Sequence, residues 1–349
     1  MNYSDNKMLF ITGASRSGTT LMSFILRNHT DIAGLNELQF FGEFWDPRSD
    51  KELDAERIKL ALATVFSRQR QGINVASPGT EDFARAETLL NSMKLETLNP
   101  AEHFAAAMHQ LSADLDKSIP CEQTPRNIFY AEALLEHYPN AYVIHMMRDP
   151  RAVMASQKQR WRLRQNAKNK SSVPISHTLR TWINYHPYTV ARLWRGASDI
   201  AWRLRNHPRF TTVRFEDLLT MPEQTLRLLC ERINIDYQPA LQDVGQINSS
   251  HQSSVEGARK GLHKDAIDKW KTELMQSEIS ITEKYCGTLM RSFGYDIDKA
   301  KNDNWLGELR YRLSYPLHIA GVLVVNPRRA FIQTRALLKK FQSNDTSSS

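Results

Sequence analysis

The chain has 349 residues, of which 41% are hydrophobic and 24% charged, the composition of a soluble globular protein with a full core. Its net charge of +8 favours anionic ligands, but no zinc-finger spacing, RNP-like motif or basic zipper supports a nucleic-acid partner, so we expect none. Three scattered cysteines exclude a disulfide framework and a cysteine metal cluster. No signal peptide precedes Met8, so we expect a cytoplasmic protein.

The stretch that organises the chain comes first. An apolar, β-prone run from Met8 to Ile11 leads into a loop of small residues between Gly13 and Gly18, and a helix is predicted to begin at Thr19. This order is typical of sites for phosphate-like anions, because N–H groups at the helix start and the helix dipole both favour negative charge. Glycines at both ends of the loop permit backbone angles and a close approach that side chains would obstruct.

The loop differs from the P-loop of nucleotide triphosphatases at one position. The spacing of Gly13 and Gly18 is right, but Thr19 stands where G-x-x-x-x-G-K-[ST] has its lysine. The cation is instead Arg16, inside the loop. This pattern argues against an ordinary ATPase or kinase and predicts a loop that holds a phosphate with an adjacent sulfonate. No metal is required by the residues present.

Strands and helices alternate along the rest of the chain. Helices are predicted over 51–70, 81–98 and 100–115, strands over 119–121, 141–147 and 210–215, and further helices over 126–138, 150–156, 222–232, 265–275 and 279–293. Residues 157–208 read as mostly helical, and 245–264 as a long loop, which inside a compact domain is usually functional or disordered.

The predicted fold class follows from this alternation. It is α/β: a P-loop-like parallel sheet flanked by helices, with ligands at the carboxyl ends of the strands. The loops at Arg16 and Arg148 should therefore face one crevice. We expect one domain over residues 1–300 and a helical C-terminal extension over 301–349 with a disordered end.

Five short motifs, in order over roughly residues 7–298, resemble the sulfotransferases that use 3′-phosphoadenosine 5′-phosphosulfate (PAPS). They are Arg16-Ser17-Gly18-Thr19-Thr20-Leu21, Cys121-Glu122-Gln123-Thr124-Pro125-Arg126, Met147-Arg148-Asp149-Pro150-Arg151, Val213-Arg214-Phe215-Glu216-Asp217-Leu218 and Phe293-Gly294-Tyr295-Asp296. The chain is most similar to the branch that contains tyrosylprotein sulfotransferases and many bacterial homologues. The resemblance implies the sulfotransferase fold, PAPS as co-substrate and adenosine 3′,5′-bisphosphate as product.

Two positions depart from the family pattern. Gln123 stands where the family has a lysine before Thr-Pro, a lysine proposed to help at the transferring group. Phe215 replaces a tyrosine found in many members, so a hydroxyl contact to the nucleotide is lost. Gln123 is also compatible with a further alternative, in which the chain is a catalytically silent family member that acts as a scaffold.

The resemblance implies a set of donor-binding residues. Arg16 and the residues after it would hold the 5′-phosphosulfate, and Arg148 with Ser156 the 3′-phosphate. Two threonines of the loop can cap the helix and also contact phosphate. We expect nucleotide contacts from Arg16, Ser17, Gly18, Thr19, Thr20, Arg148, Ser156, Ser254, Arg259 and Lys269.

A catalytic base is implied at Glu37, which follows Arg16 by the separation seen for the catalytic glutamate of the tyrosylprotein branch. Glu37 and Arg16 are therefore the expected catalytic residues. A lone glutamate near a helix start is more often solvated or a cap, so His29 and Glu43 stand as reserve bases.

The expected reaction is sulfonate transfer from PAPS to an acceptor hydroxyl. A glycan or lipid-linked glycan is the favoured acceptor; a tyrosine peptide, a small molecule, and a P-loop nucleotide-binding protein or kinase are the alternatives. Tryptophans between Trp161 and Trp202 either pack between helices or line an acceptor cleft.

The tail carries one further prediction. Leu317 to Val325 is mostly apolar but too short to span a bilayer, and basic and apolar residues alternate after it. This pattern suits either a helix on an anionic inner-membrane face or a terminal helix pair packed on the domain or on a partner chain, which leaves a homodimer open.

Overall fold

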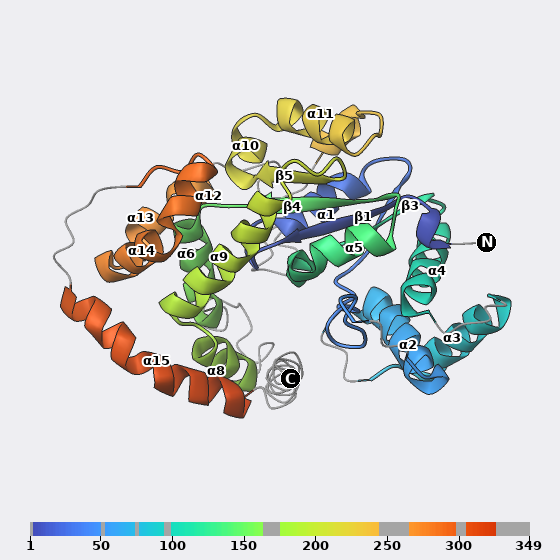
Figure 1. The fold of residues 1–349 in the computed structure, drawn as a ribbon, viewed down its shortest axis with the longest axis horizontal. Coiled ribbons are helices and arrows are strands. Elements are labelled where there is room, and N and C mark those ends of the chain that lie inside the picture. The colour runs from blue at the N-terminus through green and yellow to red at the C-terminus, as the bar shows by residue number, and fades with distance from the viewer. Residues whose placement is uncertain are drawn as a thin grey trace, which may run out of the picture. The chain divides into compact units, whose positions relative to one another are not determined.

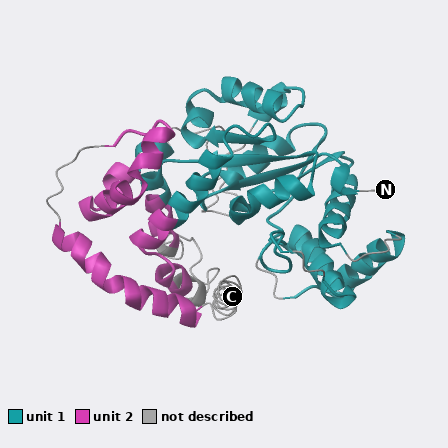
Figure 2. Cartoon of the chain, viewed as in Figure 1, with its two compact units in different colours: residues 1–153, 193–269 teal, residues 154–192, 270–349 magenta. Residues whose placement is uncertain are grey.

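The computed structural model describes residues 3–49, 53–73, 77–93, 99–162, 175–243, 265–297 and 305–325. The chain forms two compact units, shown in different colours in Figure 2. The first comprises residues 1–153 and 193–269, and the second comprises residues 154–192 and 270–349. The boundary expected at residue 300 falls between described segments and stays a prediction.

The first unit contains a five-stranded sheet in the order β2-β3-β1-β4-β5, and every pair of neighbours is parallel (Figure 1). The strands are β1 (Met8–Gly13), β2 (Ile32–Gly34), β3 (Ile119–Glu122), β4 (Ala141–Met147) and β5 (Phe210–Arg214). The register pairs Met8 with Ala141 and Leu9 with Cys121. The predicted α/β class with a parallel sheet is confirmed.

Helices of the first unit begin with α1 (Thr19–Arg27), α2 (Ala55–Gln71), α3 (Thr80–Ser92), α4 (Pro100–Ala113) and α5 (Ala131–His137). Later come α10 (Phe215–Thr220), α11 (Pro222–Arg232) and α12 (Asp265–Asp268), and short 3₁₀ turns lie at Tyr3–Asp5, Pro125–Tyr130 and Pro239–Gln242. Two helices, α6 (Pro150–Lys158) and α9 (Pro187–Arg203), run from one unit into the other.

Apolar side chains cover both faces of the sheet, as expected for parallel strands. On one face, Leu9 and Ile11 belong to a buried cluster with residues of α1 and α11. On the other, the Phe10 ring lies 5.7 Å from Tyr138 and 6.1 Å from Phe41. Every residue of β1 is buried. The sheet is therefore a rigid base for the loops that follow its strands.

The second unit is helical in the residues described. It contains a 3₁₀ turn (Gln159–Arg162), α8 (Ile175–Ile183), α13 (Trp270–Glu273), α14 (Gln276–Ser292) and α15 (Trp305–Val325). A buried carboxylate of α14, Glu278, accepts hydrogen bonds from Lys158 at the end of α6 at 2.7 Å, from Tyr185 after α8 at 2.7 Å and from Tyr311 of α15 at 3.2 Å. The helical character predicted for the C-terminal region is confirmed over 305–325.

Several predicted boundaries needed correction. The strand expected over 210–215 ends at Arg214, and Phe215 begins α10. The helix expected over 126–138 opens as a 3₁₀ turn from Pro125 and becomes α-helical at Ala131. The described helix in 81–98 ends at Ser92.

Candidate active site

The loops after all five strands lie at one edge of the sheet, because parallel strands end together. Four of these loops carry residues singled out in the sequence: Arg16 after β1, Glu37 after β2, Gln123 after β3 and Arg148 after β4. Since β1 lies between β3 and β4, its loop is central.

The loop from Gly13 to Gly18 fits tightly against its neighbours. A Cβ on Gly13 would lie 2.5 Å from the Met146 carbonyl oxygen, and a Cβ on Gly18 would lie 2.5 Å from the Phe215 ring. Gly18 also has a φ of 96°, which favours glycine. Gly13 also has a positive φ, of 149°, so both glycines are required by space and by backbone conformation.

Arg16 has a φ of 79°, in the left-handed region that costs a non-glycine residue conformational energy. Such strain is typical of functional loops, where the surrounding structure holds a residue in place. Next to it, the Ser17 hydroxyl is buried and has no hydrogen-bond partner within the described part of the chain. A buried hydroxyl in this state is a ready donor for a ligand oxygen.

The N-terminus of α1 presents backbone donors to the same place. Its cap, Gly18, has no side chain, and the first N–H groups of a helix, from Thr19 onward, lack intrahelical acceptors. The Gly18 carbonyl already accepts the first helical bond, from Met22 N–H at 3.0 Å. Together with the helix dipole, these donors favour an anion.

Arg148 joins the loop after β4 to the loop after β1. Its Nη1 donates to the Arg16 carbonyl oxygen at 3.1 Å, and its Nη2 donates to the Ala266 carbonyl oxygen at 2.8 Å. The guanidinium also lies 4.4 Å above the centre of the Phe215 ring. The structure thus brings together Arg16 and Arg148, which the sequence predicted would share a crevice.

Buried polar contacts hold the backbone next to Arg148. The indole N–H of buried Trp194 donates to the Arg148 carbonyl oxygen at 2.8 Å. Glu216 accepts the Asp149 N–H at 2.9 Å, and Arg151 pairs with the Asp149 carboxylate at 2.7 Å. Asp149 and Arg151 therefore orient this loop, and their opposite charges neutralise each other.

Glu37 lies half-buried after β2, and the Gln39 side-chain amide donates to its Oε1 at 2.6 Å. The adjoining peptide of Leu38 is held on both sides: its N–H donates to Glu122 Oε1 at 3.1 Å, and its carbonyl oxygen accepts from Arg68 Nη1 at 2.8 Å. The segment that carries Glu37 is therefore fixed by two buried ionisable side chains.

Glu122, at the end of β3, was not singled out by sequence reasoning as a site residue. Its fully buried carboxyl accepts hydrogen bonds from Leu38 N–H, from the N–H and hydroxyl of Thr124, and from Asn127 Nδ2 at 2.8 Å. Burial, helped by the nearby charge of Glu37, raises its pKa to about 7 although its hydrogen bonds act in the opposite direction. The only available signal was a carboxylate beside Gln-Thr-Pro.

Gln123 follows Glu122 directly in the chain and is also buried. Its Oε1 is buried and finds no hydrogen-bond donor among the residues that the structure describes. The family lysine at this position would add a positive charge here; glutamine leaves an acceptor and an amide donor.

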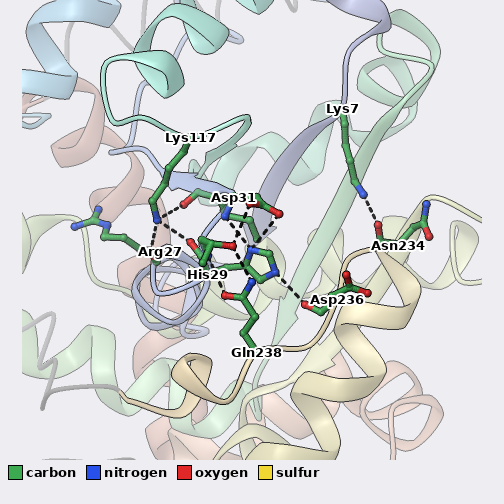
Figure 3. Close-up of polar contacts among 10 residues, drawn as sticks. Lys7, Arg27, His29, Asp31, Lys117, Asn234, Asp236 and Gln238 are labelled. Atoms are coloured by element: carbon green, nitrogen blue, oxygen red, sulfur yellow. Dashed lines mark hydrogen bonds and ion pairs between the residues drawn. The ribbon is translucent and has the colours of Figure 1, made fainter.

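The reserve bases have other partners. Figure 3 shows His29 after the far end of α1, where Nδ1 accepts the Asp31 N–H at 3.1 Å and Nε2 faces the Asp236 carbonyl oxygen at 2.9 Å. Both ring nitrogens are thus engaged. Glu43 forms an ion pair with Arg68 at 2.8 Å. Both reserve bases are therefore engaged by neighbouring residues.

Figure 3 also shows Lys117, whose side chain reaches the backbone around the end of α1. Its ammonium donates to the carbonyl oxygens of Arg27, His29 and Ile32 at 2.7 to 3.0 Å. Burial lowers the pKa of Lys117. Because its bonds go to backbone carbonyls at the end of α1, this cluster is structural.

Four further residues were predicted to contact the donor: Ser156, Ser254, Arg259 and Lys269. Ser156 lies in α6, the helix that begins two residues after Arg148. Lys269 is exposed between α12 and α13. Ser254 and Arg259 lie outside the described residues, so their roles stay predictions.

The tryptophans of this region differ in how deeply they are buried. Trp194 is buried, as expected for packing, whereas Trp182 is exposed and Trp202 half-buried with the Arg205 guanidinium 4.3 Å from its ring centre. The side chain of Trp161 lies outside the described residues.

Residues 9–239 match the profile of a family described as the sulfotransferase family. The chain belongs to the sulfotransferase family. Nodulation protein NoeE of Sinorhizobium fredii (strain NBRC 101917 / NGR234) is 26% identical to it over 303 residues, which cover 82% of this chain and 65% of NoeE. Carbohydrate sulfotransferase 5 of Mus musculus is 28% identical over 171 residues, which cover 45% of this chain and 42% of the mouse protein. The chain thus spans less than two thirds of these relatives.

Solved structures confirm the sulfotransferase fold. The sulfotransferase domain from the curacin biosynthetic pathway superposes with a TM-score of 0.52 at 17% identity, covering 84% of this chain and 99% of that domain. The sulfotransferase domain from the Synechococcus PCC 7002 olefin synthase gives a TM-score of 0.51 at 19% identity, with 83% and 95% covered. At these identities the likeness concerns the fold.

Proposed function

We propose that this sulfotransferase transfers the sulfonate group of PAPS to an acceptor hydroxyl, with Glu37 as general base. The observation that carries the donor assignment is the link from Arg148 to the Arg16 carbonyl oxygen, which holds the Arg148 guanidinium against the loop that leads into α1. An anion with two separate phosphate groups suits two arginines on neighbouring loops.

The residues present fit such a donor. The glycine cradle at Gly13 and Gly18 leaves backbone exposed where side chains would collide, and the Ser17 hydroxyl is buried without a partner in the described residues. Arg16, Ser17, Gly18, Thr19 and Thr20 would hold the 5′-phosphosulfate. Arg148 and Ser156 would hold the 3′-phosphate, with Ser254, Arg259 and Lys269 as further contacts.

The transfer step uses these groups in the following way. The acceptor oxygen forms a bond to sulfur while the bond from sulfur to the bridging phosphate oxygen breaks, and that oxygen keeps the electron pair. Glu37 takes the acceptor proton. Arg16 and the N–H groups at the start of α1 stabilise the charge that develops on the leaving phosphate, adenosine 3′,5′-bisphosphate.

A glycan hydroxyl is the favoured acceptor within this proposal. One relative is named a carbohydrate sulfotransferase, and its aligned part covers 45% of this chain. Incubation with sulfur-labelled PAPS and a panel of glycans, tyrosine peptides and small phenols would identify the acceptor class by product mass spectrometry.

A thermal-shift experiment tests the donor. Adenosine 3′,5′-bisphosphate should raise the melting temperature, because a ligand that binds only the folded state stabilises it. ATP with Mg²⁺ should not. Stabilisation by ATP with Mg²⁺ and none by the bisphosphate would contradict the proposal and favour a nucleotide-binding module.

A further inference from the structure

Helix α15 has an unusual distribution of polarity. The described helix spans Trp305–Val325, and none of its residues is buried. The side that packs against its own unit carries Glu308, Tyr311, Ser314, Tyr315 and His318, which are all half-buried. A helix that packs on a protein core normally turns its apolar side inward.

The polar side of α15 is well satisfied. Glu308 pairs with Lys284 of α14 at 2.7 Å and accepts a hydrogen bond from Ser280. Tyr311 donates to the buried Glu278 carboxylate at 3.2 Å.

Aromatic contacts complete that side. The His186 ring lies 5.0 Å from Tyr315 and 4.8 Å from His318, and the Thr189 hydroxyl lies 2.9 Å from His318 Nε2. Polar and aromatic contacts therefore fix the inward side of α15 to the second unit, and the exposed leucines take no part in them.

The exposed aliphatic residues of α15, which include Ile319, point away from the unit and fall within an arc of about 160° at 100° per residue. Half-buried Val322 and Val325 lie on the inward side. The most exposed are Leu306 at 62%, Leu313 at 69%, Leu317 at 76% and Val324 at 78%, followed by Leu323 at 44% and Leu309 at 40%; Trp305 is 64% exposed. Contiguous exposed apolar surface of this kind marks an interaction site.

The charges of α15 are sorted in the same way. Its one acidic residue, Glu308, faces inward and is paired. Arg310 and Arg312 are exposed, and the helical period places them at the two borders of the aliphatic arc. The outward surface is therefore apolar, edged by cations and free of carboxylates within 305–325.

We propose that this outward face of α15 binds an anionic lipid surface, with the helix lying in the plane of the interface. Leucines would enter the acyl boundary while the bordering arginines reach phosphate headgroups. Within the described residues, no helix combines the length and the hydrophobicity of a membrane span.

A second copy of the chain is the rival occupant. A helix pair buries a narrow seam, whereas this arc covers nearly half the helix circumference, and exposed Pro316 interrupts a straight seam at its middle. A flat surface can cover such an arc at once. The charges favour an anionic surface over a neutral one. This inference stands apart from the proposed sulfonate transfer.

Vesicle co-sedimentation of the full chain tests the proposal. Vesicles of phosphatidylcholine with about one third phosphatidylglycerol should bind the protein, and pure phosphatidylcholine vesicles should bind it far less. The variant Leu313→Glu/Leu317→Glu should lose about tenfold or more of the binding. Its matched control is Leu228→Glu in α11, a leucine that is 55% exposed, which should bind as the parent does.

A second variant tests the arginines of α15 and leaves its leucines intact, so it avoids any effect that the leucine substitutions have on folding. Arg310→Gln/Arg312→Gln should weaken binding to the anionic vesicles about 10- to 30-fold, while Arg232→Gln, an exposed arginine of α11, should not. Unchanged binding in both α15 variants would overturn the proposal. The proposal would also be overturned if the parent protein did not bind the vesicles but formed a dimer that Leu313→Glu/Leu317→Glu dissociates.

Discussion

The two halves of the sheet's carboxyl edge carry opposite chemistry. After β1 and β4 the loops present arginines, with Arg148 bonded to the Arg16 backbone and resting on Phe215. After β2 and β3 the loops present carboxyl and amide groups, with Glu37 beside buried Glu122. In the proposed reaction the loops after β1 and β4, the anion half, would hold the anionic donor, and the loops after β2 and β3, the proton half, would hold or accept the proton. Sulfonate transfer needs both, because the donor is anionic and the acceptor must lose its proton.

The proton half can be broken alone by Glu37→Gln, which keeps the shape of the side chain and removes the proton acceptor. Turnover should fall by about 10² or more. Affinity for the donor should stay nearly unchanged because the anion-binding loops are intact. Glu43→Gln, which removes an ion-paired carboxylate, is the control for steady-state rates. Normal turnover in Glu37→Gln would exclude it as the base.

The raised pKa of Glu122 in the proton half can be tested through the pH dependence of stability. Burial raises its pKa from 4.5 to about 7, so the folded protein holds the proton more tightly than the unfolded chain does. The resulting stabilisation is complete below pH 4.5 and is lost as the pH rises through 7. Relative to Glu122→Gln, which does not titrate, the parent should lose on the order of 2–3 kcal/mol of unfolding free energy over that range.

Denaturant unfolding at several pH values measures this difference. The exposed Glu136→Gln is the control and should show no such trend. If the parent instead became more stable than Glu122→Gln as the pH rises, the four hydrogen-bond donors would outweigh burial and Glu122 would be ionised in the folded state.

The packing of the anion half can be tested at Gly18. Gly18→Ala places a methyl group 2.5 Å from the Phe215 ring, whereas Gly72→Ala, which also has a positive φ but a ψ of 179°, has open space around it. Overpacking should lower the unfolding free energy of Gly18→Ala by about 1–3 kcal/mol more than that of Gly72→Ala. Thermal or urea unfolding gives both values, and equal losses would mean that the loop has room to shift.

The smallest expected effect is that of Arg148→Lys. The charge is kept, but one ammonium cannot reproduce the two bonds that the guanidinium makes to Arg16 and Ala266 in separate directions. Affinity for adenosine 3′,5′-bisphosphate should weaken about tenfold. Arg227→Lys, in an exposed pair with Glu223, is the control. Full retention of affinity would show that only the charge at position 148 matters.

The same two halves differ in how much could be predicted from sequence. The anion half is local: strand, glycine loop and helix follow one another, and β4 was predicted with its observed bounds, so Arg16 and Arg148 were expected at one edge. The proton half depends on contacts distant in the chain. Glu122 bonds to Leu38, 84 residues away, and nothing local in the sequence reports such a contact.

Backbone strain and packing direction also escaped prediction. No sequence rule places Arg16 at a φ of 79°, because the surrounding loop imposes it. The apolar run from Leu317 to Val325 was noted, but its helix begins at Trp305 and turns its polar side inward. That orientation is set by partners such as Glu278 and His186, which lie elsewhere in the chain.

The most direct test of the division between the halves is a calorimetric titration of adenosine 3′,5′-bisphosphate into the parent, Arg148→Ala and Glu37→Gln. Arg148→Ala removes a charge-assisted contact worth about 1.5–3 kcal/mol, so its affinity should fall by roughly tenfold to a hundredfold. Glu37→Gln should bind within about twofold of the parent, since it alters only the proton half. Unchanged binding in Arg148→Ala, or a comparable loss in Glu37→Gln, would contradict the assignment of donor binding to the arginine loops.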